Sequence, residues 1–317
     1  MPQTASTFVL SDLPGYKADP RLWRPTPRPS DLSLVFAAQW LPPSLVDPVS
    51  GIYAFFKATL QLAEAGDELR PEKLAAWRSA SRDAFDGHRS GHAMIDSVMG
   101  DAAQHHVPFR HIERIFEGAD DKAAGRIVRD VADLRRHTRS TGGALGGWLT
   151  ERAGVHDPLV VAYGYELGHA MQLTRIVRDV GRDLTNGRCF LPADHLAQYG
   201  LDVERLEHVR VHRGVGVPRS FRHLLEDLMQ MADQAYDISL TAAAALPGGA
   251  SRAAIIAGRV YQGIHDAVRR AGHDTLRLRV RTRYLERGKL AARALANLAR
   301  MDRVRLRLAR SAVAAAD

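Results

Sequence analysis

The sequence is poor in cysteine, in aromatic residues and in long apolar runs. Among its 317 residues, one cysteine, Cys189, cannot form an intramolecular disulfide. No stretch reaches the roughly 18 consecutive apolar residues of a membrane-spanning helix. The first twenty residues also lack the basic start and apolar core of a signal peptide. We therefore expect a cytoplasmic protein.

Nucleic-acid motifs are missing too, although the chain is basic. It has 44 Lys and Arg against 36 Asp and Glu, a formal net charge of +8. Such an excess of positive charge is typical of proteins that bind nucleic acid, an anionic membrane surface or a small anionic substrate. There is no zinc-ligand spacing and no helix-turn-helix signal, and the glycines of 142–147 lack the Lys-Ser/Thr ending of a phosphate loop. We expect no nucleic-acid partner.

What the sequence does have is helical periodicity. Residues 1–32 hold six prolines and predict an irregular N-terminal arm. From 33 to 300, apolar residues recur at spacings of three and four, which predicts one all-α domain. The alternation over 276–281 is interpreted as the start of a helix. The expected helices cover 50–65, 72–84, 91–105, 125–139, 159–183, 219–245 and 251–271.

The end of the chain carries most of the positive charge. Residues 277–310 contain twelve Lys and Arg against two acids. We expect 301–317 to form a basic, alanine-rich tail, solvated or resting on an anionic membrane surface as a peripheral contact.

The stretch 159–192 has the clearest chemical pattern. Gln172, Asp179 and Asp183 fall on one face of a helix, flanked by arginines. Two carboxylates on a buried face are costly unless a cation joins them, whereas on a solvated face they simply pair with arginine. Gly164 and Gly168, four residues apart, share one helix face, where close core packing is favoured over a ligand.

The residues QLTRIVRDVGRDLTNGRCFLP, at 172–192, closely resemble the second aspartate motif of the squalene and phytoene synthase family. Weaker resemblances cover 51–68, 141–146 and 251–289. The resemblance implies an isoprenoid synthase fold, a single helical domain around a central cavity. It also implies Mg²⁺ held by aspartates of two facing helices, which bind allylic isoprenyl diphosphates that are joined head to head.

The chain departs from that pattern in both motifs. Leu60 and Gln61 stand where the first motif has aspartates, and Glu64 keeps a carboxylate. The other differences are Lys57 for an arginine, Arg175 for a metal-binding asparagine, Arg182 for an acid and His137 for a tyrosine. With half the metal ligands gone, the site looks suited to one diphosphate rather than two.

We therefore hypothesise a prenyltransferase that ionises one allylic diphosphate, such as dimethylallyl diphosphate. It would pass the prenyl group to a non-isoprenoid, aromatic acceptor, as squalene-synthase-like carbazole prenyltransferases of natural product biosynthesis do. Asp179 and Asp183 would hold Mg²⁺, and His137 or Glu64 would take the proton. The remaining site residues, which would contact substrate or neutralise its diphosphate, are Arg175, Arg178, Tyr53, Phe56, Lys57, Leu60, Gln61, Gln172, Tyr261 and Arg279.

Two alternatives stay open. The first is the family reaction itself, a head-to-head squalene, phytoene or hydroxysqualene-type synthesis, which the loss of acids at Leu60 and Gln61 disfavours. The second is a non-catalytic relative that acts as a partner or assembly protein.

Overall fold

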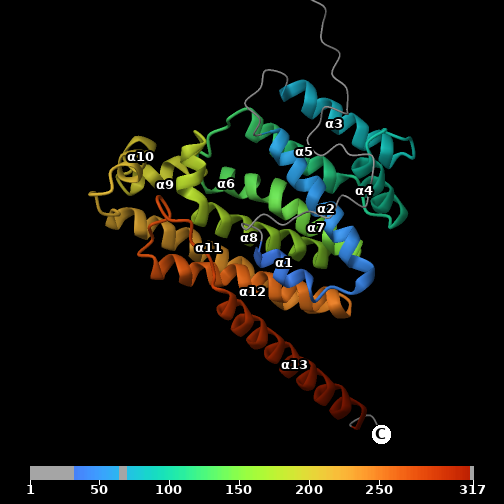
Figure 1. Cartoon of the computed structure of the whole chain (residues 1–317). Helices are drawn as coiled ribbons and strands as arrows, with labels where there is room; N and C mark the ends of the chain where they lie inside the picture. Colours follow the sequence, from blue (N-terminus) through green and yellow to red (C-terminus); the bar gives the residue numbers. More distant parts are fainter. Residues whose placement is uncertain (1–31, 64–69, 315–317) are drawn as a thin grey trace, which may run out of the picture.

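The computed structural model describes residues 32–63 and 70–314, and within these ranges the chain is helical and has no β-strand (Figure 1). This confirms the predicted all-α class. The elements are α1 (Leu32–Ala38), α2 (Pro43–Leu62), α3 (Arg70–Phe85), α4 (Ala93–Gln104), α5 (Arg110–Ala123), α6 (Val131–Thr138), the π-helix η4 (Arg139–Gly143), α7 (Ala144–Arg152), α8 (Pro158–Thr185), α9 (Ala193–Gln198), α10 (Val203–Val211), α11 (Arg219–Ala242), the 3-10 helix η5 (Ala243–Ala245), α12 (Gly248–Arg270) and α13 (Tyr284–Ala314).

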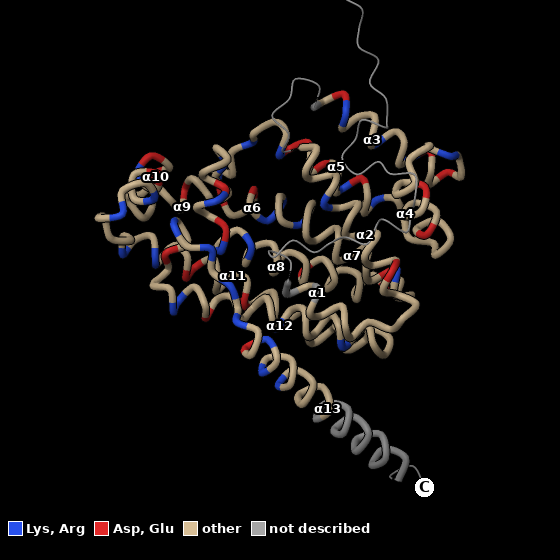
Figure 2. Tube along the Cα trace, viewed as in Figure 1, with Lys and Arg blue, Asp and Glu red and all other residues tan. Residues whose placement is uncertain are grey.

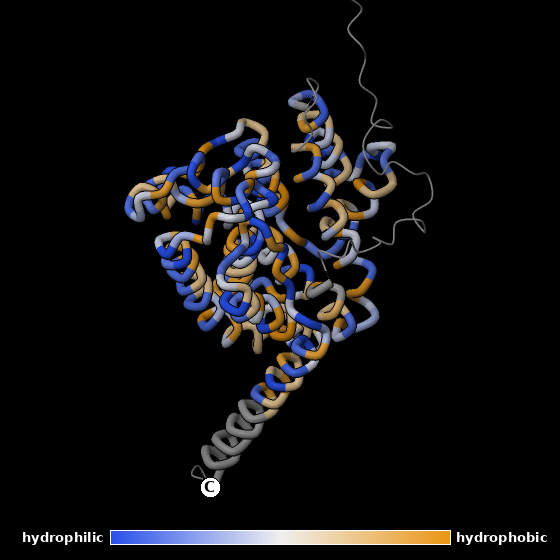
Figure 3. Tube along the Cα trace, turned by 60° about the vertical axis from the view of Figure 1, so that its left-hand side comes forward, coloured by the Kyte–Doolittle hydropathy of each residue, from blue (hydrophilic) through white to orange (hydrophobic). Residues whose placement is uncertain are grey.

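Helix α8 lies at the centre and joins two hydrophobic cores. Val161 and Tyr165, near its start, pack with α2, α3, α4, α5 and α7. Its later residues, from Ala170 to Leu184, pack with α11 and α12. Hydrophobic and hydrophilic residues share most helices (Figure 3), the amphipathic pattern from which they were predicted. Because α8 belongs to both cores, its polar side chains are held from both sides.

Glycines set how closely α8 approaches the segment before it. A Cβ built on Gly168 would lie 1.9 Å from the carbonyl oxygen of Gly142, and one on Gly164 would lie 2.9 Å from the carbonyl oxygen of Gly146. Only a residue without a side chain permits such contact between backbones. The predicted packing role of the two glycines is thus confirmed.

Several boundaries differ from the predicted ones. Helix α6 begins at Val131 rather than near Gly125, and α5 was not predicted. The alternating stretch 276–281 is neither strand nor helix, and it belongs to an irregular segment, 271–283, that contacts α8 at Gly181. The helix expected there starts later, at Tyr284.

The C-terminal helix α13 packs its first part against α12 and, before residue 300, already leads away from the body (Figures 1 and 2). The side chains from 300 onward, and nearly all of the predicted arm 1–32, lie outside the described residues, so the predicted membrane contact of the tail stays a prediction. None of the helices in 32–63 and 70–314 combines the length and apolar character needed to cross a bilayer.

We expect Gly168→Ala to destabilise the protein by about 1–3 kcal/mol, because the new methyl group would force α8 away from η4. Gly100→Ala in α4 is the matched control, since a Cβ there meets no atom within 4 Å. It should leave stability unchanged or raise it by about 0.5–1 kcal/mol through helix propensity. Urea unfolding of both variants tests this, and equal stabilities would contradict the close-contact interpretation.

Candidate functional site

Helix α8 is kinked at Asp179, where the backbone leaves helical geometry with φ −107° and ψ 15°. Two residues further on, the Gly181 N–H donates to the Thr275 carbonyl oxygen at 3.0 Å, outside its own helix. A Cβ on Gly181 would lie 1.8 Å from the Leu276 carbonyl oxygen. The irregular segment 271–283 therefore presses directly onto α8, and this contact accounts for the kink.

Guanidinium groups surround the carboxylate of Asp179, whose side chain is 0% exposed. Arg178 donates to both oxygens, at 3.0 and 2.8 Å. Arg182 approaches Oδ2 at 2.8 Å. Burial favours the protonated form, but the hydrogen bonds from Arg178 and the charges of the nearby arginines outweigh it, so the pKa of Asp179 is lowered. Asp179 is therefore ionised at neutral pH.

Asp183 lies one turn later in a different environment. Its Oδ1 is 3.5 Å from Nη2 of Arg182 and 3.9 Å from Nη2 of Arg175. Its Oδ2 is buried and has no hydrogen-bond partner among the described residues. Burial raises the pKa of Asp183, although Arg175 and Arg182 oppose the shift. An unpaired buried carboxylate oxygen is costly and is the type of ligand that a cation satisfies.

The segment 271–283 and helix α12 complete the cluster. Arg279 Nε lies 3.9 Å from Oδ1 of Asp179. Arg178 also hydrogen-bonds Tyr261 of α12. Arg175, Arg178, Asp179, Asp183, Tyr261 and Arg279, predicted from distant parts of the sequence, thus come together. Arg182 was identified from the sequence only as a departure from the motif, whereas in the structure it contacts both carboxylates.

The described residues of the cluster offer a metal ion a single unpaired carboxylate oxygen, that of Asp183. Within 32–63 and 70–314, no three His, Cys, Asp or Glu side chains form a group that could hold a metal ion. Both oxygens of Asp179 are already engaged by arginine, which leaves the buried Oδ2 of Asp183 as the fitting donor. Mg²⁺ is often held by one or two carboxylates together with substrate phosphates.

A cavity of about 310 Å³ lies beyond Asp183, at the end of α8. His137 lines it and stacks on Phe190, with ring centroids 4.8 Å apart. Burial, reinforced by the charges of Lys122, Arg175 and Arg136, lowers the pKa of His137 to about 3. His137 is therefore neutral at physiological pH, and its environment makes it a weak base. Lys122, which also faces Asp183, was not predicted because nothing in α5 resembles a motif.

The predicted residues of α2 form a separate group. Phe56 and Leu60 are buried in the core shared by α2 to α5, and Tyr53 lies beside Phe56 with ring centroids 6.2 Å apart. Lys57 and Gln61 are partly exposed on the same helix. Gln172 of α8 packs instead against Gly142, and Glu64 lies outside the described residues.

The end of the motif reaches toward α2. Arg188 Nη2 lies 3.5 Å from the carbonyl oxygen of Ala63, the residue that caps α2. Arg188 also lines the cavity beside His137. The contact places the loop after α8 next to the helix that carries the altered first motif.

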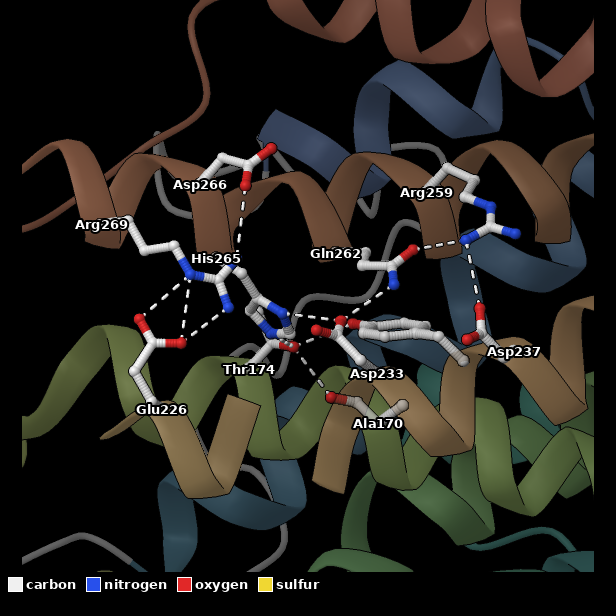
Figure 4. A network of polar contacts seen from close by, with 11 residues as sticks. Ala170, Thr174, Glu226, Asp233, Asp237, Arg259, Gln262, His265, Asp266 and Arg269 are labelled. Atoms are coloured by element: carbon white, nitrogen blue, oxygen red, sulfur yellow. Dashed lines mark hydrogen bonds and ion pairs between the residues drawn. The ribbon is translucent and has the colours of Figure 1, made fainter. Parts of the chain in front are cut away.

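A buried polar network fixes α8 just before the cluster (Figure 4). Thr174 Oγ1 lies 2.9 Å from Nε2 of His265 in α12, whose Nδ1 lies 2.9 Å from Oδ1 of Asp233 in α11. The order Thr–His–Asp resembles a hydrolase triad, but Thr174 is 0% and His265 2% exposed, so no substrate reaches the hydroxyl. The network instead ties α8, α11 and α12 together next to Arg175.

The chain also matches a known protein family. The model of the family described as squalene/phytoene synthase matches residues 28–286. The chain therefore belongs to the squalene/phytoene synthase family, which confirms the resemblance found in the sequence.

Individual relatives are named phytoene synthase or squalene synthase. A phytoene synthase of Rhodobacter capsulatus is 27% identical over 84% of this chain and 78% of its own length. One of Thermus thermophilus is 32% identical over 77% and 82%. The crystal structure of a squalene synthase from Alicyclobacillus acidocaldarius matches with a TM-score of 0.68 at 20% identity, covering 80% of this chain and 92% of that one. The isoprenoid synthase fold predicted from the motifs is thus confirmed.

Because the pKa of His137 is lower in the folded state than in the unfolded chain, stability should fall as the pH drops below about 6.5. One such histidine costs about 1.4 kcal/mol of unfolding free energy between pH 7.5 and 5.5. The His137→Phe variant keeps a ring against Phe190. Between pH 7.5 and 5.5, we expect its unfolding free energy to fall by about 1.4 kcal/mol less than that of the unmodified protein. Urea unfolding at both pH values measures the difference, and an unchanged pH dependence would show that His137 is not buried in its neutral form.

Proposed function

We propose that this chain is a prenyltransferase of the head-to-head type, which joins two isoprenyl diphosphates. The observation that carries the proposal is the guanidinium and carboxylate cluster at the kink of α8, built by the segment that resembles the family's second motif. Relatives named phytoene synthase support a second isoprenyl diphosphate as the acceptor. They favour this reaction over the aromatic acceptor preferred in the sequence analysis.

The cluster would bind the diphosphate of the allylic substrate. Ionisation of an allylic diphosphate separates a carbocation from a leaving group that gains negative charge. Fixed guanidinium groups stabilise that charge without having to reorganise, and those of Arg175 and Arg279 are partly exposed and able to reach it. Asp183 would hold Mg²⁺, which would supply further positive charge to the same diphosphate.

The hydrocarbon part of the substrate needs apolar walls and stabilisation of the cation. Tyr261, hydrogen-bonded to Arg178, lies beside the cluster. On α2, the partly exposed Tyr53 would offer an aromatic face, which attracts a carbocation through its π electrons, and the buried Phe56 lies beside it. Lys57, one position after Phe56, would contribute charge to a diphosphate on that side.

A second candidate is transfer to an uncharged, aromatic acceptor, and Leu60 and Gln61 favour it. An apolar side chain and an amide replace two expected metal ligands there, so that side lacks the carboxylates to bind a second diphosphate through metal. In this reaction the neutral His137 would accept the proton released when the acceptor regains aromaticity.

Product stoichiometry separates the two reactions. We expect farnesyl or geranylgeranyl diphosphate alone to give a C30 or C40 product, with two diphosphates released for each product molecule once both groups have left. Mass spectrometry of extracts, combined with a diphosphate assay, measures both quantities. One diphosphate per product, formed only when an aromatic acceptor is added to dimethylallyl diphosphate, would establish the second candidate instead.

Variants of the cluster test the residue roles. Arg175→Gln removes a charge-assisted contact with the diphosphate and should lower kcat/KM by about 10- to 100-fold. Asp183→Asn should lower it by a similar factor. Arg135→Gln is the control, because Arg135 pairs with Glu166 at an exposed position and should leave turnover unchanged. Full activity in both cluster variants would contradict the assigned site.

A further inference from the structure

The Asp179 carboxylate serves as the counter-ion of Arg178 and Arg182. It receives two hydrogen bonds from Arg178 and a close contact from Arg182, and its side chain is 0% exposed. To ligate a metal ion, it would have to give up charge-assisted hydrogen bonds that are already well formed. In this arrangement the first of the two motif aspartates therefore orients arginines.

The surroundings also disfavour a second or third metal ion. Leu60 and Gln61 supply no carboxylate from α2, and Asp183 offers a single unpaired oxygen. Among the described residues, the guanidinium groups of Arg175, Arg178, Arg182 and Arg279 all lie within 4 Å of the Asp179 carboxylate, and those of Arg175 and Arg182 also lie within 4 Å of Asp183. Because positive groups outnumber carboxylates here, the cluster repels a bare divalent cation and attracts a polyanion.

Three of the four guanidinium groups remain accessible. The side chains of Arg175, Arg182 and Arg279 are 21%, 38% and 35% exposed, whereas that of Arg178 is 7% exposed. Arg175 and Arg279 approach Asp179 only to 3.9 Å, beyond hydrogen-bond distance, so these contacts do not consume their N–H donors. A planar guanidinium group presents paired donors that match two phosphate oxygens.

We infer that Arg175, Arg182 and Arg279 bind the diphosphate directly, in a site that does not require Mg²⁺ to hold it. The inference rests on the proposed function, since it assigns how that site takes its diphosphate. Arg182 is the decisive residue, because it stands where the family pattern has an acid and it neutralises Asp179. Mg²⁺ at Asp183 then adds to a diphosphate that is already bound.

Calorimetric titration of the full-length protein with inorganic pyrophosphate tests this directly. We expect the Kd in excess EDTA to stay within about threefold of the Kd in excess Mg²⁺, because guanidinium contacts supply most of the affinity. Binding that weakens more than about tenfold in EDTA would overturn the inference and leave the proposed diphosphate site intact. No binding under either condition would overturn the diphosphate site itself.

Variants at position 182 extend the test. Arg182→Glu removes a guanidinium group and restores an acid, so we expect pyrophosphate affinity to become dependent on Mg²⁺ by at least about tenfold. Arg182→Gln should weaken binding in EDTA by about 10-fold without creating that dependence. Arg135→Gln should bind as the unmodified protein does. An Arg182→Glu protein that unfolds at the same temperature and shows no gain in Mg²⁺ dependence would contradict the role of Arg182.

Discussion

The carboxylate of Asp179 is ionised although it is almost completely buried, and the arrangement of the site depends on its neutralisation. Removing a single charge from water costs several kcal/mol unless partners and hydrogen bonds replace the lost hydration. Arg178 and Arg182 provide them from the same helix, and Arg279 approaches from the segment 271–283. Without these arginines, an uncompensated charge would lie between α8 and its neighbours.

That neutralisation depends on a backbone contact that only glycine allows. Gly181 lets the carbonyls of Thr275 and Leu276 press against α8, and the same contact carries Arg279 to the carboxylate. Before the kink, the bonds from Thr174 to His265 and Tyr236 hold α8 against α11 and α12. The cluster is thus fixed on both sides of Asp179, and its guanidinium groups occupy set positions before any substrate arrives.

The long helices and half of the site could be predicted from sequence, for identifiable reasons. Helices α8, α11 and α12 have strong apolar periodicity, and the spacing of Asp179 and Asp183 is local information. The irregular course of 276–281 could not be predicted, because its Leu-Arg alternation gives no sign of the contact with Gly181. Lys122 was missed for the same kind of reason, since its position near Asp183 and His137 arises from packing between α5 and α6.

The altered residues on α2 and α8 are consistent with one another. An acid lost at Leu60 or Gln61 removes a metal ligand, and a metal lost from such a site removes positive charge that a departing diphosphate needs. Arg175 and Arg182 supply positive charge from α8. Unlike a bound metal ion, these charges are part of the protein itself. Fixed arginines, however, neutralise a diphosphate only where they stand, whereas a metal ion can bridge two substrates. In the proposed reaction, the α2 side, with its buried Leu60 and partly exposed Gln61, would then determine whether the acceptor is charged.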